Sequence, residues 1–168
     1  MNSLVQTLTA TLGGTIPSEL IIFLISMLPL LELRGGLLAA SPALLNVPIL
    51  RAIPICILGN LLPIPFILLL VERLLNWMES VPGLGSIAHW IRARADRNKG
   101  QIETYGFWGL TLFVGIPLPG TGAWTGSLVA SLLHMRIRKS FPAILLGVAI
   151  ATVIMSIISY GLLGVLFG

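Results

Sequence analysis

The sequence predicts an all-α integral membrane protein, and three observations lead to that prediction. Of the 168 residues, 56% are hydrophobic and only 10% are charged, whereas a soluble domain carries about a quarter charged residues. Two uncharged segments, residues 52–71 and 141–167, reach the length of about 20 apolar residues that a membrane crossing needs. Two further apolar regions are interrupted by proline and glycine. This composition argues against a soluble enzyme, a disordered chain and a disulfide-rich secreted protein. Residues 1–168 are therefore expected to form a single membrane domain.

The first predicted crossing, residues 52–71, contains Pro54, Pro63 and Pro65. Proline removes a helical hydrogen bond and clashes with the preceding turn, so this crossing is expected to be kinked or locally unwound. The second predicted crossing, residues 141–167, is uncharged and contains glycines at positions 147 and 161. Both segments are expected to span the membrane as helices.

The two interrupted regions each consist of two half-length apolar arms. Residues 16–31 and 37–45 flank a break rich in proline and glycine, and residues 105–118 and 123–133 flank another. Arms of this length favour a re-entrant helical hairpin, which enters the membrane to mid-depth and returns to the same side. Two ordinary short hairpins that cross fully are the alternative, and both alternatives give the same overall topology.

The two hairpins align when the chain is shifted by ninety positions. Pro29 then meets Pro119, and Gly36 meets Gly126. Each half, residues 16–71 and 104–167, would contain one hairpin and one crossing, so the second half would lie upside down relative to the first. Such inverted repeats are common in secondary transporters, although chance similarity in an apolar sequence is the alternative.

Residues 72–103 form a polar linker between these halves. Trp77, Trp90 and several arginines in the linker favour an amphipathic helix at the membrane interface, and a plain solvated connector is the alternative. Basic residues gather in this linker and in the 134–140 loop, which the positive-inside rule places in the cytoplasm, with both termini outside. These residues are Arg73, Arg92, Arg94, Arg97, Lys99, Arg136, Arg138 and Lys139.

Glu32 and Arg34 are the ionisable residues at the predicted tip of the first hairpin, followed by Gly35 and Gly36. Charged groups inside a membrane are costly and commonly functional. We interpret the pair as a substrate-binding or proton-coupling site. The alternative is a mutually neutralising pair that only pins the hairpin.

The second tip carries hydroxyls, glycines and a tryptophan but no charge. Two half-helix N-termini that point to the membrane midplane would present free N–H groups. Together with Arg34, they predict a cavity for an anion such as a phosphate or carboxylate, with Glu32 as the proton-coupling group. The other predicted site residues are Asn60, Pro119, Gly120, Thr121, Gly122, Trp124 and Thr125.

Recognisable enzyme signatures are missing from the sequence, including hydrolase, nucleotide-binding and metal-site motifs. We therefore expect no enzymatic activity, no catalytic residue, no metal, no cofactor and no nucleic-acid partner. The expected partners are membrane lipids, protons and a small amphipathic substrate. A homodimer is left open, because few helices are available to enclose two hairpins.

Three segments resemble the small multi-drug export protein family: residues 28–36 (LPLLELRGG), 59–65 (GNLLPIP) and 105–122, which contains YGFWG and PLPGTG. That family is similar to the DedA/VTT superfamily, whose members carry two facing re-entrant hairpins. The resemblance implies a prokaryotic inner (plasma) membrane protein. Through the DedA-like relatives it also implies proton-linked translocation of an anionic lipid such as undecaprenyl phosphate, with Glu32 and Arg34 at the matching charged positions.

These considerations predict a transporter, and they leave its substrate open between classes. The first hypothesis is proton-coupled transport or flipping of a lipid phosphate through a midplane site between the hairpins. The second is a small multidrug exporter of cationic drugs that uses Glu32 for proton exchange. An intramembrane lipid pyrophosphatase is a distant third, because the PGTGAWTGS segment resembles a phosphatase loop but lacks its serine and arginine. An assembly protein without transport is the fourth.

Overall fold

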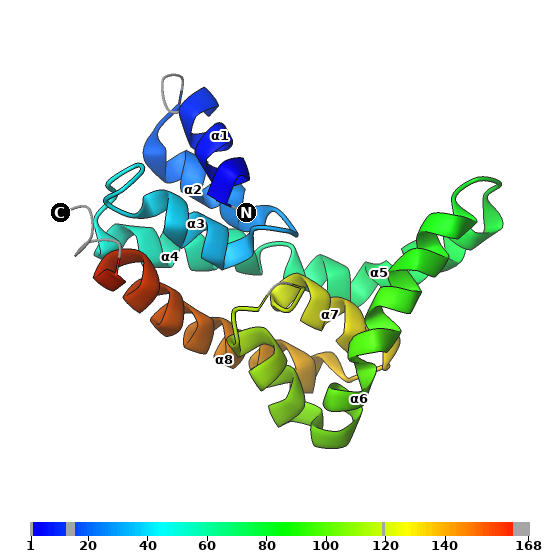
Figure 1. Cartoon of the computed structure of the whole chain (residues 1–168). Coiled ribbons are helices and arrows are strands. Elements are labelled where there is room, and N and C mark those ends of the chain that lie inside the picture. The colour runs from blue at the N-terminus through cyan, green and yellow to red at the C-terminus, as the bar shows by residue number, and fades with distance from the viewer. Residues whose placement is uncertain (1, 13–15, 119, 163–168) are drawn as a thin grey trace.

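The computed structural model describes residues 2–12, 16–118 and 120–162. Over these residues the protein is built from helices and contains no strand, which confirms the all-α prediction (Figure 1). The elements are α1 (Asn2–Leu12), α2 (Ser18–Met27), α3 (Glu32–Ala40), α4 (Ile49–Leu61), α5 (Ile64–Ser80), α6 (Gly85–Gly115), α7 (Ala123–Leu132), α8 (Ile137–Ser156) and the π-helix η1 (Ile157–Leu162).

Two helical segments are long and apolar enough to cross a membrane. They are Ile49–Ser80, with 32 residues, and Ile137–Gly161, with 25 residues. Both contain most of a predicted crossing, and residues 163–167 of the second prediction lie outside the described part. The first segment consists of α4 and α5, which meet at a turn at residues 62–63. Pro63 is the N-cap of α5 and Pro65 lies in its first turn, so the helix is interrupted at these prolines, whereas Pro54 lies inside α4.

The helices α2 and α3 form the first hairpin and pack closely against α4. Their contact depends on small residues, because a Cβ on Gly36 would collide with the Ser26 hydroxyl and the Cys56 thiol. Gly59 of α4 lies in turn against α2, where an added Cβ would be 2.6 Å from the Phe23 carbonyl oxygen. The first long apolar helix thus supports the hairpin.

The second hairpin consists of the last part of α6 and α7. The helix α6 bends at Gly106 (φ 55°, ψ −119°), where the positive φ favours glycine. After this bend, residues 107–115 pack against α7 and α8, with Gly126 and Gly147 at the two close contacts. An added Cβ on Gly147 would be 2.7 Å from the Thr111 carbonyl oxygen. Gly147 therefore has the same relation to α6 that Gly59 has to α2.

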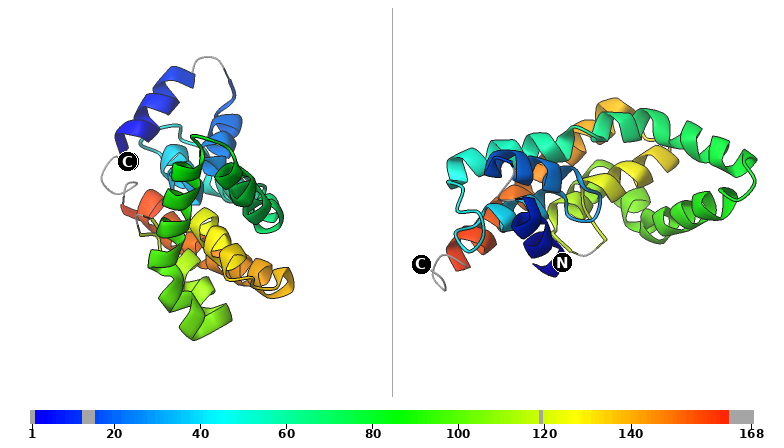
Figure 2. Two further views of the ribbon diagram at one scale, coloured as in Figure 1. Left: turned by 90° about the vertical axis from the view of Figure 1, so that its right-hand side faces the viewer. Right: turned by 90° about the horizontal axis from the view of Figure 1, so that it is seen from above.

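The polar linker, residues 72–103, is divided between two helices. Residues 72–80 continue α5, and α6 begins at Gly85 and runs through residue 103 without a break. Residues 81–84 form a turn between the two helices, where Pro82 cannot extend α5 and Gly83 has a φ of 91°. The result is an antiparallel arm of α5 and α6 that projects away from the other helices (Figures 1 and 2).

Both ends of the described chain pack near the first hairpin. The helix α1, which was not predicted from the sequence, contacts α2 and α3 and buries Val5. At the other end, the Tyr160 hydroxyl donates to the carbonyl oxygens of Val47 at 2.8 Å and Ala40 at 3.2 Å. Tyr160 therefore fixes the loop that leaves α3 to the end of the second long apolar helix.

Candidate functional site

Glu32 begins α3, yet its carboxylate binds the first turn of α7. Oε2 accepts a hydrogen bond from the Ala123 N–H at 3.0 Å, and Oε1 accepts one from the Trp124 N–H at 3.2 Å. The first amides of a helix lack partners within the helix and carry partial positive charge, so a carboxylate there is stabilised. Only 4% of Glu32 is exposed. One hairpin tip thus caps a helix of the other hairpin.

Gly122 makes this contact sterically feasible. It has a φ of 133°, and a Cβ at this position would overlap the Glu32 carboxylate. Glycine accommodates such a backbone conformation without a steric penalty. The glycine that precedes α7 therefore leaves room for the carboxylate to reach the helix amides.

Arg34 also reaches the opposite tip. Its Nη1 donates to the Leu118 carbonyl oxygen at 2.5 Å, and its Nη2 lies 3.5 Å from the Leu30 carbonyl oxygen. The residue is 8% exposed. Glu32 and Arg34 therefore each bind backbone groups of the opposite tip.

The half-helix pattern predicts free amides at the start of α7 that could bind an anion. In the structure these amides already have a hydrogen-bond partner. The Glu32 carboxylate from the facing hairpin accepts hydrogen bonds from the Ala123 and Trp124 N–H groups. Thr121 is also committed: its hydroxyl donates to the carbonyl oxygens of Ile116 at 2.8 Å and Leu118 at 2.9 Å. Its role here is to fold the second tip.

A large chamber lies beside the joined tips. It has a volume of about 620 Å³ and is bounded by the α2–α3 turn, α3, α5, α6, the second tip and α7. Most of its wall is apolar, and Arg34 is the one charged residue among the described residues that line it. Its walls are formed by Pro29, Leu30, Arg34, Ile67, Val71, Trp90, Ile91, Gly120, Thr121, Trp124, Thr125 and Leu128.

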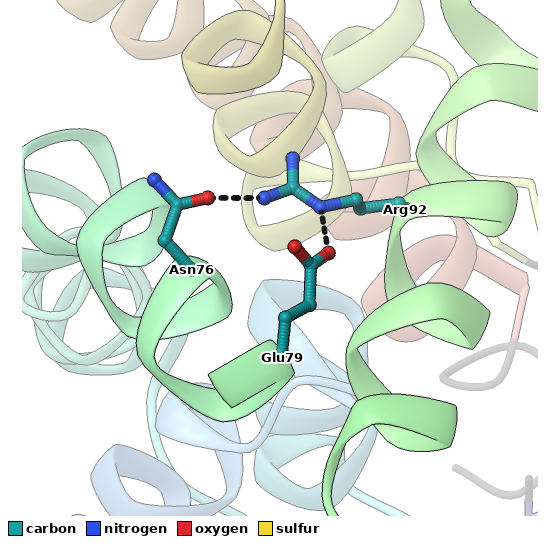
Figure 3. Close-up of polar contacts among 3 residues, drawn as sticks. All are labelled: Asn76, Glu79 and Arg92. Carbon is teal, nitrogen blue, oxygen red and sulfur yellow. Dashed lines mark hydrogen bonds and ion pairs between the residues drawn. The ribbon is translucent and has the colours of Figure 1, made fainter. Parts of the chain in front are cut away.

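The α5–α6 arm forms the outer wall of the chamber. Trp90 and Ile91 line the chamber from α6, and the next residue, Arg92, joins that helix to α5. Arg92 Nε lies 2.7 Å from Glu79 Oε1, and Arg92 Nη2 lies 2.6 Å from Asn76 Oδ1 (Figure 3). These polar contacts hold α6 against α5 at the level of the chamber wall.

A second, much smaller cavity lies on the other side of Arg34. Its volume is about 20 Å³, and Glu32, Arg34, Asn60 and Thr121 are among its lining residues. Asn60 is 2% exposed. Arg34 Nε and Asn60 Oδ1 are buried and have no hydrogen-bond partner within the described part of the protein. Arg34 and Thr121 line both cavities and so lie between them.

The structure brings most of the predicted site residues together. Glu32, Arg34, Asn60 and the second-tip residues Gly120, Thr121, Gly122, Trp124 and Thr125 all line one of the two cavities. Gly35 and Gly36 do not line either one: Gly35 packs on Leu31 and Ile25, and Gly36 packs on Ser26 and Cys56. Pro119 lies outside the described residues.

The chamber walls contributed by α5 and by the α2–α3 turn, including Ile67, Val71 and Leu30, were not predicted from the sequence. In an apolar chain these residues resemble lipid-facing ones. The apolar face around Trp90 was the available signal for the remaining wall. No group of three or more metal-ligating side chains occurs among the described residues.

Comparisons with known proteins give one match. A search of curated proteins and a search of solved structures found nothing similar. The sequence profile described as "Putative small multi-drug export protein" matches residues 32–154, which is most of the chain and contains Glu32, Arg34 and the second tip. Together with the two long apolar helices, this match indicates a membrane protein. The chain belongs to the small multi-drug export protein family.

Proposed function

We propose that this protein exports lipophilic small molecules across the membrane and binds them in the 620 Å³ chamber. That chamber is the observation on which the proposal rests. Ligand sites for drug-sized molecules are typically about 300–1,000 Å³, mostly apolar, and furnished with a few polar groups. Trp124 adds an indole N–H that is buried and has no partner among the described residues. The family description points to the same class of function, and transport needs no catalytic residue.

Helix lengths support re-entrant hairpins in this proposal. The helices α2, α3 and α7 contain 10, 9 and 10 residues. At 1.5 Å per residue each is about 15 Å long, roughly half of the hydrocarbon thickness of a bilayer. Two hairpins that enter from opposite sides would meet at mid-depth. The contacts of Glu32 and Arg34 with the second tip fit this arrangement.

The glycine contacts support an inverted repeat. Gly36 and Gly126 lie where the two arms of their own hairpin pack together. Gly59 and Gly147 lie where each long apolar helix packs on the first arm of its hairpin. The two halves thus use glycine at corresponding contacts, which is unexpected if their similarity arose by chance.

One contact supports the placement of the two basic segments, the polar linker and residues 134–140, on the same side of the membrane. His134 Nδ1 lies 3.4 Å from Glu72 Oε1, so residues 134–140, which include the first turn of α8, begin next to the start of the polar linker. Both segments are rich in Arg and Lys, and both would face the cytoplasm of a prokaryotic inner membrane. The termini would then lie on the outer side.

Glu32 is the proposed proton-coupling group. As a carboxylate it is held by the partial positive charge at the start of α7. Addition of a proton would remove that attraction and weaken the contact between the tips. A proton gradient would thereby alternate the chamber between a closed and an opened state.

A second candidate function is the flipping of an anionic amphiphile such as a lipid phosphate. It is favoured by one observation: the charge in the chamber wall is the guanidinium of Arg34. An arginine in an apolar wall would attract a phosphate or carboxylate headgroup. The implied DedA/VTT relationship leads to the same candidate. Cationic drugs fit this wall less well, because Glu32 lines the small cavity and not the chamber.

Transport into proteoliposomes separates these functions. Under an imposed pH gradient, purified protein should accumulate neutral lipophilic dyes, and Glu32→Gln should abolish the accumulation. Glu19→Gln, which makes the same change far along α2, should leave it intact. Folded protein that moves no lipophilic compound of any charge would refute export. A loss confined to anionic lipid analogues in Arg34→Gln would favour lipid flipping, and phosphate release from a lipid pyrophosphate would indicate a hydrolase instead.

A further inference from the structure

The 20 Å³ cavity has polar groups that lack partners on more than one side. Asn60 Oδ1 is a buried acceptor and Arg34 Nε is a buried donor, and neither has a hydrogen-bond partner among the described residues. The Glu32 carboxylate borders the same space and retains acceptor capacity beyond its two backbone hydrogen bonds. A buried polar group without a partner is costly, since it has lost its hydrogen bonds to water. The residues around the cavity are therefore suited to a small polar occupant.

We propose that this cavity is a single-water site that relays protons to Glu32, with Asn60 as the residue that positions the water. The proposal deepens the proposed function, since it assumes that Glu32 couples transport to protons. A cavity needs about 10–15 Å³ to hold one water molecule, so 20 Å³ accommodates one and excludes a drug-sized substrate. One water can accept from Arg34 Nε–H, donate to Asn60 Oδ1 and donate to Glu32. These three hydrogen bonds are the number typical of a buried water.

The charges around the site favour water over a metal cation. Glu32 and Asn60 would offer oxygen ligands to Na⁺, but the guanidinium of Arg34 borders the same cavity and would repel it. Across all the elements that line the cavity, α3, α4, α6, α7 and α8, Glu32 and Arg34 are the charged residues. Thr121 contributes a hydroxyl that is already bound to its own loop.

The relay itself is a simple proton transfer. A proton that reaches the water is passed on in one concerted step: the water binds it at a free lone pair and releases one of its own protons to a Glu32 oxygen, so no hydronium stands beside Arg34. The protonated Glu32 oxygen is then a poorer acceptor for the α7 amides. Asn60 does not exchange the proton; it holds the water by one hydrogen bond and is a positioning residue. The site therefore connects proton arrival to the contact between the two tips.

Asn60→Leu tests the site, because leucine has a similar volume and cannot hold the water. In proteoliposomes, Asn60→Leu should lower pH-driven accumulation about 100-fold, the low end for a positioned proton-transfer group, while counterflow without a pH gradient persists. Asn60→Ser, which keeps an oxygen at the wall, should restore pH-driven accumulation. Thr152→Val is the matched control, since Thr152 is buried on α8 and its hydroxyl donates to the Val148 carbonyl of its own helix.

Two readouts do not depend on transport. A high-resolution experimental structure should contain one water between Asn60 Oδ1 and Arg34 Nε, and Asn60→Leu should lose it. The infrared carboxyl band of Glu32 should change in Asn60→Leu but not in Thr152→Val. Sodium-driven accumulation, a metal ion in the cavity, or pH-driven accumulation that survives in Asn60→Leu would overturn the proposal. If the wild type transports nothing, the proposed function fails, and the structure and infrared band still decide the water site.

Discussion

At the scale of single residues, Glu32 combines an unusual backbone conformation with a long-range role. Its φ is 50°, in the left-handed region of backbone conformation, which residues other than glycine, asparagine and aspartate rarely adopt. Such a conformation costs about 1–3 kcal/mol and persists where the surroundings enforce it. Here the hydrogen bonds to the Ala123 and Trp124 amides provide that compensation.

Replacement of Glu32 by glutamine should therefore weaken the whole protein as well as transport. The amide keeps the shape, but it removes the charge and turns an NH₂ group towards backbone donors. Hydrogen bonds to a charged group contribute about 1.5–3 kcal/mol each, so a loss of about 2 kcal/mol is expected. Thermal unfolding in detergent, followed by tryptophan fluorescence, measures the change. An unfolding temperature equal to that of Glu19→Gln would contradict the assigned contact.

Gly122→Ala should destabilise the protein for two separable reasons. The residue has a φ of 133°, and an added Cβ would overlap the Glu32 carboxylate. Gly83 provides the matched control, because it also has a positive φ, 91°, but a Cβ added there would meet no atom within 4 Å. Gly83→Ala therefore reports backbone strain alone, about 1 kcal/mol. Gly122→Ala should cost clearly more in the same thermal assay, and equal losses would argue against the Glu32 contact.

At the scale of elements, the arm of α5 and α6 closes one side of the chamber. Arg92 binds Glu79 and Asn76, and the side chains of Arg92 and Glu79 are 28% and 32% exposed. An ion pair this exposed contributes only about 0–1 kcal/mol to stability. Its main effect is expected on the position of Trp90 and Ile91, which line the chamber.

Arg92→Ala should thus reduce the affinity for lipophilic compounds several-fold while the unfolding temperature changes little. Glu79→Ala should have a smaller effect, because Arg92 keeps its contact with Asn76. The double variant should be no worse than Arg92→Ala alone, because Arg92→Ala already removes the contact with Glu79. Equilibrium binding of a fluorescent lipophilic dye measures the affinity of the two single variants and of the double variant. Additive losses in the double variant would show that the two side chains act independently.

The elements predicted from the sequence are those whose signal is local, and the ones missed are defined by tertiary contact. Uninterrupted hydropathy is enough to find residues 52–71 and 141–167. The prolines predict an interruption in the first of these segments, but they do not say at which proline it lies. The helix α1 was missed because its apolar residues alternate with threonine and glutamine. It is recognised in the structure by the burial of Val5 against the first hairpin.

The sequence predicts which residues belong to the candidate site better than it predicts how those residues are arranged. Scarcity of charge singled out Glu32 and Arg34, and proline and glycine breaks singled out the second tip. The bond from Glu32 to Ala123 spans 91 residues, so no local pattern encodes it. For the same reason the amides of α7 were expected to await a substrate. The chamber walls at Ile67 and Val71 were missed, since hydropathy does not distinguish a chamber-facing residue from a lipid-facing one.

At the scale of the whole molecule, Tyr160 connects the end of the second long apolar helix to the loop that follows α3. Its hydroxyl bonds carbonyl oxygens at Ala40 and Val47 on either side of the loop after α3. Tyr160→Phe removes this donor and leaves the ring in place. We expect a loss of about 1 kcal/mol and faster hydrogen exchange in residues 41–48, with little change in the chamber. Exchange that stays unchanged in this loop would contradict the role.

The long reach of Glu32 also determines the order in which the chain can be completed. When the ribosome has made the first hairpin, the amides that will bind its carboxylate lie 91 residues ahead. The Leu118 carbonyl for Arg34 lies 84 residues ahead. The two charged groups of the first hairpin can therefore reach these backbone partners only after the second tip has been synthesised. The second half of the chain is thus needed to complete the first.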